Sequence, residues 1–101
     1  MNKIVTDRIE ELRQLCKEYN VKSMYAFGAV CTEFFDDKSD IDFMIIFEDN
    51  SVVRNSFKYV ELHFKLQDLF GRKIDLLTDL SLSNLYTRDR LEQTKQLIFE
   101  A

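Results

Sequence analysis

Two stretches of the chain carry a helical pattern of apolar positions. The first predicts an amphipathic helix over residues 3–19, with apolar side chains at steps of four and three at Val5, Ile9, Leu12, Cys16 and Tyr19. The same kind of spacing predicts a second helix over residues 53–69, from Val53, Phe57, Val60 and Phe64. Gly71 follows this helix at the position of a left-handed C-terminal cap. Residues 82–95 are predicted as a last helix.

Three apolar, β-prone runs separate these helices. The predicted strands are VKSMYAF before Gly28, IDFMIIF over residues 41–47 and KIDLLT over residues 73–78. The middle run is almost continuously apolar, which is typical of a central strand covered on both faces. The tail QLIFE either continues the last helix or forms a short strand, and its pattern leaves both open.

The order of these elements predicts the fold class. Reading the connection over residues 29–39 as a helix or loop, the order α-β-α-β-α-β-α predicts an α/β (α+β) fold, with helices packed on a small mixed β-sheet. The helix between the second and third strands makes those strands parallel, whereas the short connection favours antiparallel pairing of the first and second. No linker or internal repeat is visible, so we expect one domain over residues 1–101.

Composition excludes several classes of protein. The net charge is −4 and the pI is about 4.9, which argues against binding to nucleic acid or to anionic membranes. Two cysteines and one histidine do not make a zinc cluster or a disulfide framework, and they indicate a reducing compartment. The N-terminal segment lacks the apolar stretch of a signal peptide, so we expect a cytoplasmic protein.

Acidic side chains interrupt the most apolar runs. Asp40 and Asp42 open the 41–47 run, and side chains at i and i+2 of a strand point to the same side. Asp75 interrupts a second apolar run. Ionised carboxylates buried together repel one another, and such clusters persist where a cation lies between them. Mg²⁺ held by carboxylates and substrate phosphates fits this pattern, and solvated strand-edge acids or helix caps are the alternative.

The spacing from Gly28 to the first two aspartates carries a family resemblance. A glycine directly after a strand lets the backbone approach a phosphate closely. Gly28-Ala29 is followed by ten residues and then Asp40-Ile41-Asp42, in FGAVCTEFFDDKSDIDF, with Asp75 later in RKIDLLT. The chain resembles the minimal nucleotidyltransferases of the DNA polymerase β superfamily, whose signature is Gly-Ser, ten residues, Asp-x-Asp and a third Asp on a later strand. The resemblance extends over nearly the whole chain.

The resemblance implies a fold, an activity and a set of site residues. The implied fold is the nucleotidyltransferase fold, and the implied activity is transfer of AMP from ATP to a hydroxyl, with release of pyrophosphate. Asp40 and Asp42 would hold catalytic Mg²⁺, and Asp75 would be a third metal ligand that helps to activate the attacking hydroxyl. The residues that would bind the nucleotide are Gly28, Ala29 and Ser39.

The resemblance also implies a partner. Short members of this family are commonly antitoxins that adenylylate a tyrosine of an all-helical HEPN ribonuclease toxin. Direct nucleic-acid or membrane binding is not expected, and a homo-oligomer is left open.

The chain departs from the family signature on the phosphate side. Ala29 replaces the serine, whose hydroxyl would donate to a phosphate oxygen, and Thr32 and Glu33 stand where an arginine and a glycine are common. An alternative function is therefore a catalytically impaired binding module that neutralises a partner by contact. Adenylylation of an antibiotic-like small molecule is less favoured, because about 100 residues leave no room for a second enclosing domain.

Five other polar or reactive residues are expected to have no catalytic role. His63 is expected on the exposed face of its helix, and Cys31 is expected as a small buried hydrophobe. Arg88 and Arg90 are expected, with Tyr86, on the solvated face of the last helix, and contact with nucleotide or partner is the alternative.

Overall fold

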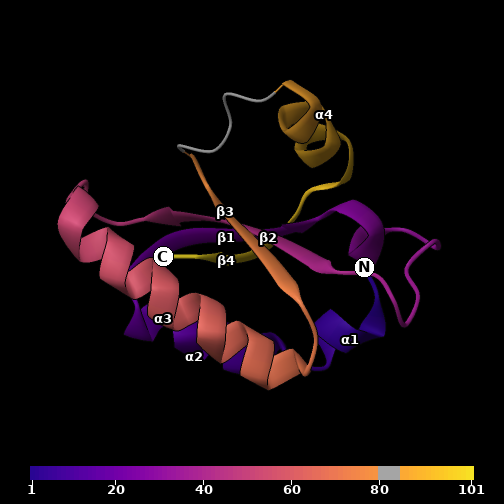
Figure 1. Ribbon diagram of the computed structural model, residues 1–101, viewed down its shortest axis with the longest axis horizontal. Coiled ribbons are helices and arrows are strands. Elements are labelled where there is room, and N and C mark those ends of the chain that lie inside the picture. Colours follow the sequence, from indigo (N-terminus) through magenta and orange to yellow (C-terminus); the bar gives the residue numbers. More distant parts are fainter. Residues whose placement is uncertain (80–84) are drawn as a thin grey trace.

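The computed structural model describes residues 1–79 and 85–101, and helices and strands alternate along it (Figure 1). In chain order the elements are α1 (Lys3–Thr6), α2 (Ile9–Glu18), β1 (Val21–Phe27), the 3₁₀ helix η1 (Gly28–Cys31), β2 (Ile41–Phe47), α3 (Val52–Phe70), β3 (Ile74–Thr78), α4 (Leu85–Thr94) and β4 (Gln96–Glu100). The predicted order is confirmed, and the tail QLIFE is a strand. The part of the last predicted helix that precedes residue 85 lies outside the described residues. No helix in the described ranges is long and apolar enough to cross a membrane.

The first predicted helix is two helices, which corrects the prediction of one continuous helix. The amide of Asp7 donates to the Lys3 carbonyl at 2.8 Å, and the amide of Arg8 then donates to the Val5 carbonyl at 3.0 Å. The second bond spans three residues instead of four, so the backbone tightens after α1 and the regular helix begins again at Ile9.

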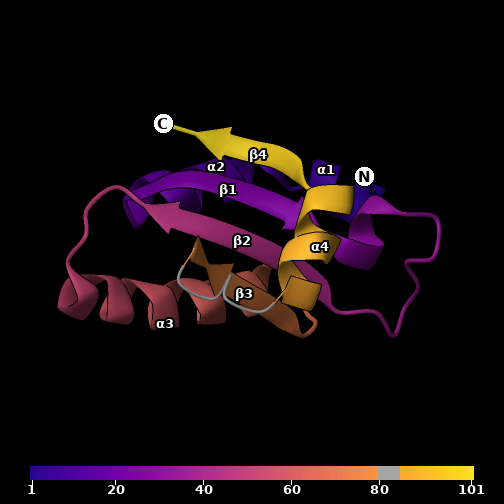
Figure 2. The same ribbon diagram turned by 90° about the horizontal axis from the view of Figure 1, so that it is seen from above.

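The four strands form one mixed sheet in the order β3-β2-β1-β4. β1 and β2 pair antiparallel, and β2 and β3 pair parallel through the α3 crossover, as predicted. β4 adds antiparallel to the free edge of β1, so the end of the chain closes that side of the sheet (Figure 2).

Helices cover both faces of the sheet. α2 and α3 lie on one face and α4 lies on the other, over the end where β1 stops and β2 begins (Figures 1 and 2). The prediction of a doubly covered central strand is confirmed, because Ile41 to Ile45 are all buried. Alternate residues of β2 face opposite layers, with Phe43 in the large core beside α2 and α3 and Met44 in a small cluster beside α4. Asp42 therefore points to the α4 side.

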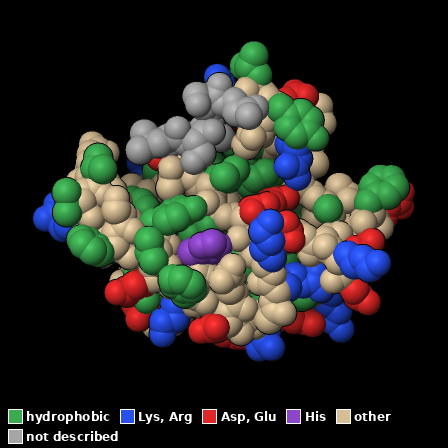
Figure 3. Space-filling model, viewed as in Figure 1, with side chains coloured by type: hydrophobic (Ala, Val, Ile, Leu, Met, Phe, Trp, Pro, Cys, Tyr) green, Lys and Arg blue, Asp and Glu red, His purple; other side chains and the backbone are tan. Residues whose placement is uncertain are grey.

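α3 ends as the sequence predicts, but a different face of it packs on the sheet. Gly71 caps it in the left-handed conformation, with φ 62° and ψ 31°. Leu62 and Leu66 are its buried side chains. The stripe that predicts the helix is exposed: the exposed fractions are 69% at Val53, 72% at Phe57, 50% at Val60 and 60% at Phe64. Figure 3 shows apolar side chains gathered over this helix. α3 therefore carries a second apolar face that nothing in the described residues covers.

Candidate active site

The sheet brings the predicted carboxylates and the glycine loop together at one end. Phe27, the last residue of β1, pairs with Asp42 of β2, and Asp42 in turn pairs with Asp75 of β3. Gly28 follows Phe27 directly and so lies beside Asp42. Three strands thus converge on Asp42.

Asp42 is the buried member of this group. It is 6% exposed, and its Oδ2 atom accepts a hydrogen bond from Nη2 of Arg90 at 3.0 Å. Burial and the neighbouring Asp75 carboxyl raise the pKa of Asp42 to about 6, against the opposing effect of the Arg90 charge. Burial and the nearby Asp75 carboxyl therefore disfavour a negative charge on Asp42.

The other two aspartates are more accessible. Asp75 is exposed, and Asp40 forms an ion pair with Lys73 at 3.4 Å between Oδ2 and Nζ. Within residues 1–79 and 85–101, no three acidic, histidine or cysteine side chains are gathered closely enough to hold a metal ion. The structure thus brings Asp42 and Asp75 together, while Asp40 is paired with Lys73.

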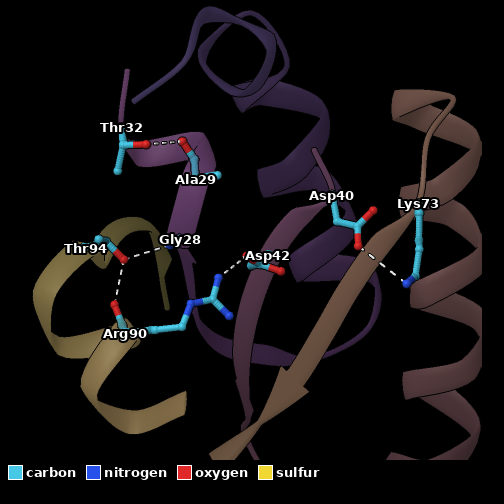
Figure 4. Close-up of polar contacts among 8 residues, drawn as sticks. All are labelled: Gly28, Ala29, Thr32, Asp40, Asp42, Lys73, Arg90 and Thr94. Atoms are coloured by element: carbon cyan, nitrogen blue, oxygen red, sulfur yellow. Dashed lines mark hydrogen bonds and ion pairs between the residues drawn. The ribbon is translucent and has the colours of Figure 1, made fainter. Parts of the chain in front are cut away.

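The glycine at the start of η1 is required by its surroundings. Gly28 has φ 75°, a conformation that residues with a Cβ rarely adopt. A Cβ at this position would overlap Oδ2 of Asp42 and would lie 2.7 Å from Nη2 of Arg90. Its amide donates to the Thr94 hydroxyl at 2.7 Å, and that hydroxyl donates to the Arg90 carbonyl at 2.7 Å (Figure 4). The glycine loop is therefore linked to the last turn of α4.

The rest of the predicted nucleotide loop is closed by its own hydrogen bonds. The Ala29 carbonyl accepts from both the amide and the hydroxyl of Thr32, at 2.9 and 2.8 Å. The Ser39 hydroxyl bonds to Asp36, at 3.0 Å to its carboxylate and 3.1 Å to its amide. Ser39 is therefore not in hydrogen-bond contact with Gly28, although its segment leads into Asp40.

Arg90 is a site residue that was expected on the solvated face of the last helix. It contacts Asp42, so that expectation is wrong. It lies 48 residues from Asp42 in sequence, and no local sequence pattern in α4 predicts the contact. The sequence gives one indication of it: several aspartates close together need a positive charge nearby, and a lysine or arginine elsewhere in the chain can supply it.

His63 and Cys31 are both half-buried. His63 is half-buried, and its Nε2 atom lies 2.7 Å from the Ile74 carbonyl of β3, so the exposed assignment is wrong. The cause is that His63 lies on the face of α3 that packs on the sheet, next to Leu62. Cys31 is half-buried against the core, and burial raises the pKa of its thiol, which agrees with an unreactive role.

A comparison with protein-family models assigns the chain to a family. The family model for polymerase beta, nucleotidyltransferase, matches residues 10–101. The chain belongs to this nucleotidyltransferase family. Two proteins of Methanocaldococcus jannaschii support the assignment: "Putative protein adenylyltransferase MJ1379" is 36% identical over 75% of both chains, and "Putative protein adenylyltransferase MJ1217" is 34% identical over 88% of this chain and 89% of that protein.

Solved structures confirm the fold of this nucleotidyltransferase. A structure described as a "putative minimal nucleotidyltransferase" superposes with a TM-score of 0.74, at 21% identity over 95% of both chains. A chain of the Shewanella oneidensis complex of tri-AMPylated HEPN toxin with MNT antitoxin gives 0.66, at 15% identity over 95% of this chain and 72% of that one. A chain of a toxin–antitoxin structure with AMP-PNP gives 0.71, at 17% identity over 92% and 73%. The predicted minimal nucleotidyltransferase fold is confirmed.

The chemistry of the acidic group fits a hard divalent cation. Asp42 and Asp75 offer carboxylate oxygens from adjacent parallel strands, and the Asp75 carboxyl raises the cost of a charge on Asp42, which a bound cation would offset. Asp40, which precedes β2, is paired with Lys73 and not with these two carboxylates. The donor set of this nucleotidyltransferase therefore suits Mg²⁺.

Proposed function

We propose that this nucleotidyltransferase is an Mg²⁺-dependent adenylyltransferase that moves AMP from ATP to a tyrosine hydroxyl of a HEPN-type toxin and so acts as an antitoxin. The observation that carries the proposal is the convergence of Gly28, which follows β1, with Asp42 of β2 and Asp75 of β3 at the same end of the sheet. The names of the M. jannaschii relatives and of the toxin–antitoxin structures point to the same acceptor class.

Each part of the site has a role in this reaction. Gly28 leaves room at the end of β1 for the Asp42 carboxylate and the Arg90 guanidinium, next to which the nucleotide phosphates would lie. Asp42 and Asp75, with Asp40, would hold Mg²⁺, which neutralises charge on the phosphates when bound. The acceptor hydroxyl attacks the α-phosphate, the bond to pyrophosphate breaks, and AMP is left on the acceptor oxygen. Asp75 is exposed, so it is open to the incoming hydroxyl whose proton has to leave.

The test is transfer of label from ATP to the partner. The chain is incubated with Mg²⁺, ATP labelled in its α-phosphate and a HEPN toxin from its own genome, and the modified residue is located by mass spectrometry. We expect AMP on a tyrosine, and no labelling in EDTA. Calorimetric titration of ATP is expected to give much weaker binding in EDTA than in Mg²⁺, because Ala29 and Glu33 supply no donor to the phosphates. Absence of labelled toxin in Mg²⁺ contradicts the proposal.

Restoring the signature serine is expected to improve the enzyme. Ala29→Ser adds one hydroxyl beside the phosphates, and a hydrogen bond to a charged group contributes about 1.5–3 kcal/mol, or about 10- to 100-fold. We expect tighter ATP binding and faster AMP transfer, up to that bound, with little change in melting temperature. Glu33 limits the gain because its charge repels the phosphates.

The control for this substitution is Ala101→Ser, which adds the same hydroxyl at an exposed position after β4. If Ala29→Ser changes neither ATP affinity nor transfer rate, residues 28–29 do not contact phosphate.

A second candidate function, neutralisation of a partner by contact, is favoured by the exposed apolar stripe of α3. Phe57 and Phe64 are 72% and 60% exposed, one helical face of aromatic side chains that the described residues leave uncovered. A groove of about 610 Å³ opens beside this stripe, between the first turns of α3 and the far ends of β2 and β3. Both features lie away from the aspartates, so contact and catalysis are separable.

Substitution of the stripe separates these two functions. We expect Phe57→Ser to change the free energy of unfolding by no more than about 0.5 kcal/mol, because its side chain is mostly in solvent. If the stripe binds the toxin, this variant loses protection of cells while it retains ATP binding. Lys65→Ser, an exposed position on the adjoining face of α3, is the control. Full protection by the Phe57→Ser protein contradicts the contact function.

A further inference from the structure

The segment between Gly28 and Asp40 carries a single cation, Lys38, and its side chain is exposed. Ala29 has no hydroxyl and Glu33 adds a negative charge, whereas ATP brings a strongly anionic triphosphate. Two cations near the site already have partners. Arg72 donates to the Asp36 and Ser39 carbonyls at 3.2 and 2.9 Å, and Lys73 pairs with Asp40.

The guanidinium of Arg90 lies over the glycine at the end of β1. Its Nη2 atom is 2.7 Å from the position of a Cβ on Gly28 and 3.0 Å from Oδ2 of Asp42. Figure 4 shows the side chain reaching from α4 toward Asp42, beside Gly28. The positive charge is therefore located beside both the Gly28 backbone and the buried carboxylate.

Several contacts hold Arg90 in this position. Its guanidinium lies 5.8 Å from the ring centroids of both Phe27 and Tyr86, within the range of cation–π attraction. Thr94 links the Arg90 carbonyl to the Gly28 amide, which couples the end of α4 to the glycine loop. The side chain is 39% exposed, and in residues 1–79 and 85–101 its hydrogen bond to Asp42 uses one of its five N–H groups. The side chain is therefore partly open to a ligand.

We propose that Arg90 binds the triphosphate of the nucleotide and supplies the donor that Ala29 lacks. The inference rests on the nucleotidyltransferase function proposed above and names the residue that receives its substrate. A planar guanidinium matches two phosphate oxygens at once, which a lysine ammonium does not. In the nucleotide-free protein the same group offsets the charge of Asp42.

Calorimetric titration with ATP in Mg²⁺ tests this assignment without a transfer assay. Arg90→Gln is expected to weaken ATP binding by about 10- to 100-fold, the size of a lost hydrogen bond to a charged group. Arg90→Lys is expected to lie between this variant and the wild type. Arg88→Gln removes the same charge from an exposed position of the same helix and is expected to bind ATP like the wild type. Inorganic tripolyphosphate is expected to show the same ranking, whereas adenosine is expected to bind all four proteins equally.

Three outcomes overturn the proposal. Equal ATP affinity of the Arg90→Gln and Arg88→Gln proteins, with a lower melting temperature for the first, makes Arg90 a structural ion-pair partner only. Tighter ATP binding by Arg90→Gln makes Arg90 a competitor of the cation at Asp42. Failure of the wild type to bind ATP removes the proposed function and this inference together, whereas ATP binding that is indifferent to Arg90 removes the inference alone.

Discussion

Asp42→Asn is expected to lower the rate of AMP transfer by about 10²- to 10³-fold or more, the usual cost of losing a preorganised electrostatic group. The carboxamide has nearly the same shape as the carboxylate but carries no charge, so it holds a divalent cation poorly. Asp42 is the buried point where β1, β2 and β3 converge, and the other carboxylates are too exposed to replace it. The measurement is initial rate of label transfer from ATP to the toxin.

The matched control is Asp68→Asn, which makes the same chemical change at an exposed position of α3. It is expected to transfer AMP at the wild-type rate. Transfer by the Asp42→Asn protein at the rate of this control would show that the carboxylates are not the reaction centre, and the contact function would then be the stronger account.

The first three strands and their pairing could be predicted from the sequence, because the apolar pattern of the side chains and the rules for connecting strands give the same answer. Residues 41–45 are apolar apart from Asp42, and a strand buried on both faces needs that composition. The crossover through α3 then makes β2 and β3 parallel and places Asp75 opposite Asp42. The identity of Gln96–Glu100 was not accessible, because five residues fit either state and pairing with β1 decides between them.

The packing of α3 was inaccessible for a related reason. Its sequence offers two apolar faces, and periodicity does not say which of them the sheet covers. The face with Leu62 and Leu66 is covered, while the face with Phe57 and Phe64 is exposed. A helix with two such faces indicates either an uncovered surface or a partner.

The contact between Arg90 and Asp42 could not be predicted from the sequence motif. The signature residues Gly28, Asp42 and Asp75 are close in the sheet order, so their convergence follows from strand pairing. Arg90 reaches them from α4, which packs on the sheet through Leu91 in the cluster with Phe27 and Met44. That contact depends on tertiary packing across 48 residues, which no local spacing encodes.

Stability in the absence of metal is expected to fall as the pH rises through 6, because of Asp42. The pKa of this carboxyl rises from 3.8 to about 6 in the folded protein, chiefly through burial. The folded state therefore binds the proton more tightly than the unfolded chain does, and this contribution is complete below pH 3.8 and lost above pH 6. A difference of this size corresponds to about 3 kcal/mol.

Asp42→Asn removes this titration and fixes the neutral state. In EDTA we expect its free energy of unfolding to match the wild type near pH 4 and to exceed it by up to about 3 kcal/mol at pH 7.5. Urea unfolding at pH steps from 4 to 8 measures the difference, with Asp68→Asn as the control that follows the wild type. A penalty for Asp42→Asn that is the same at every pH would mean that the ion pair with Arg90 outweighs burial. Mg²⁺ favours the ionised carboxylates, so adding it at pH 7.5 is expected to stabilise the wild type and to leave Asp42→Asn nearly unchanged.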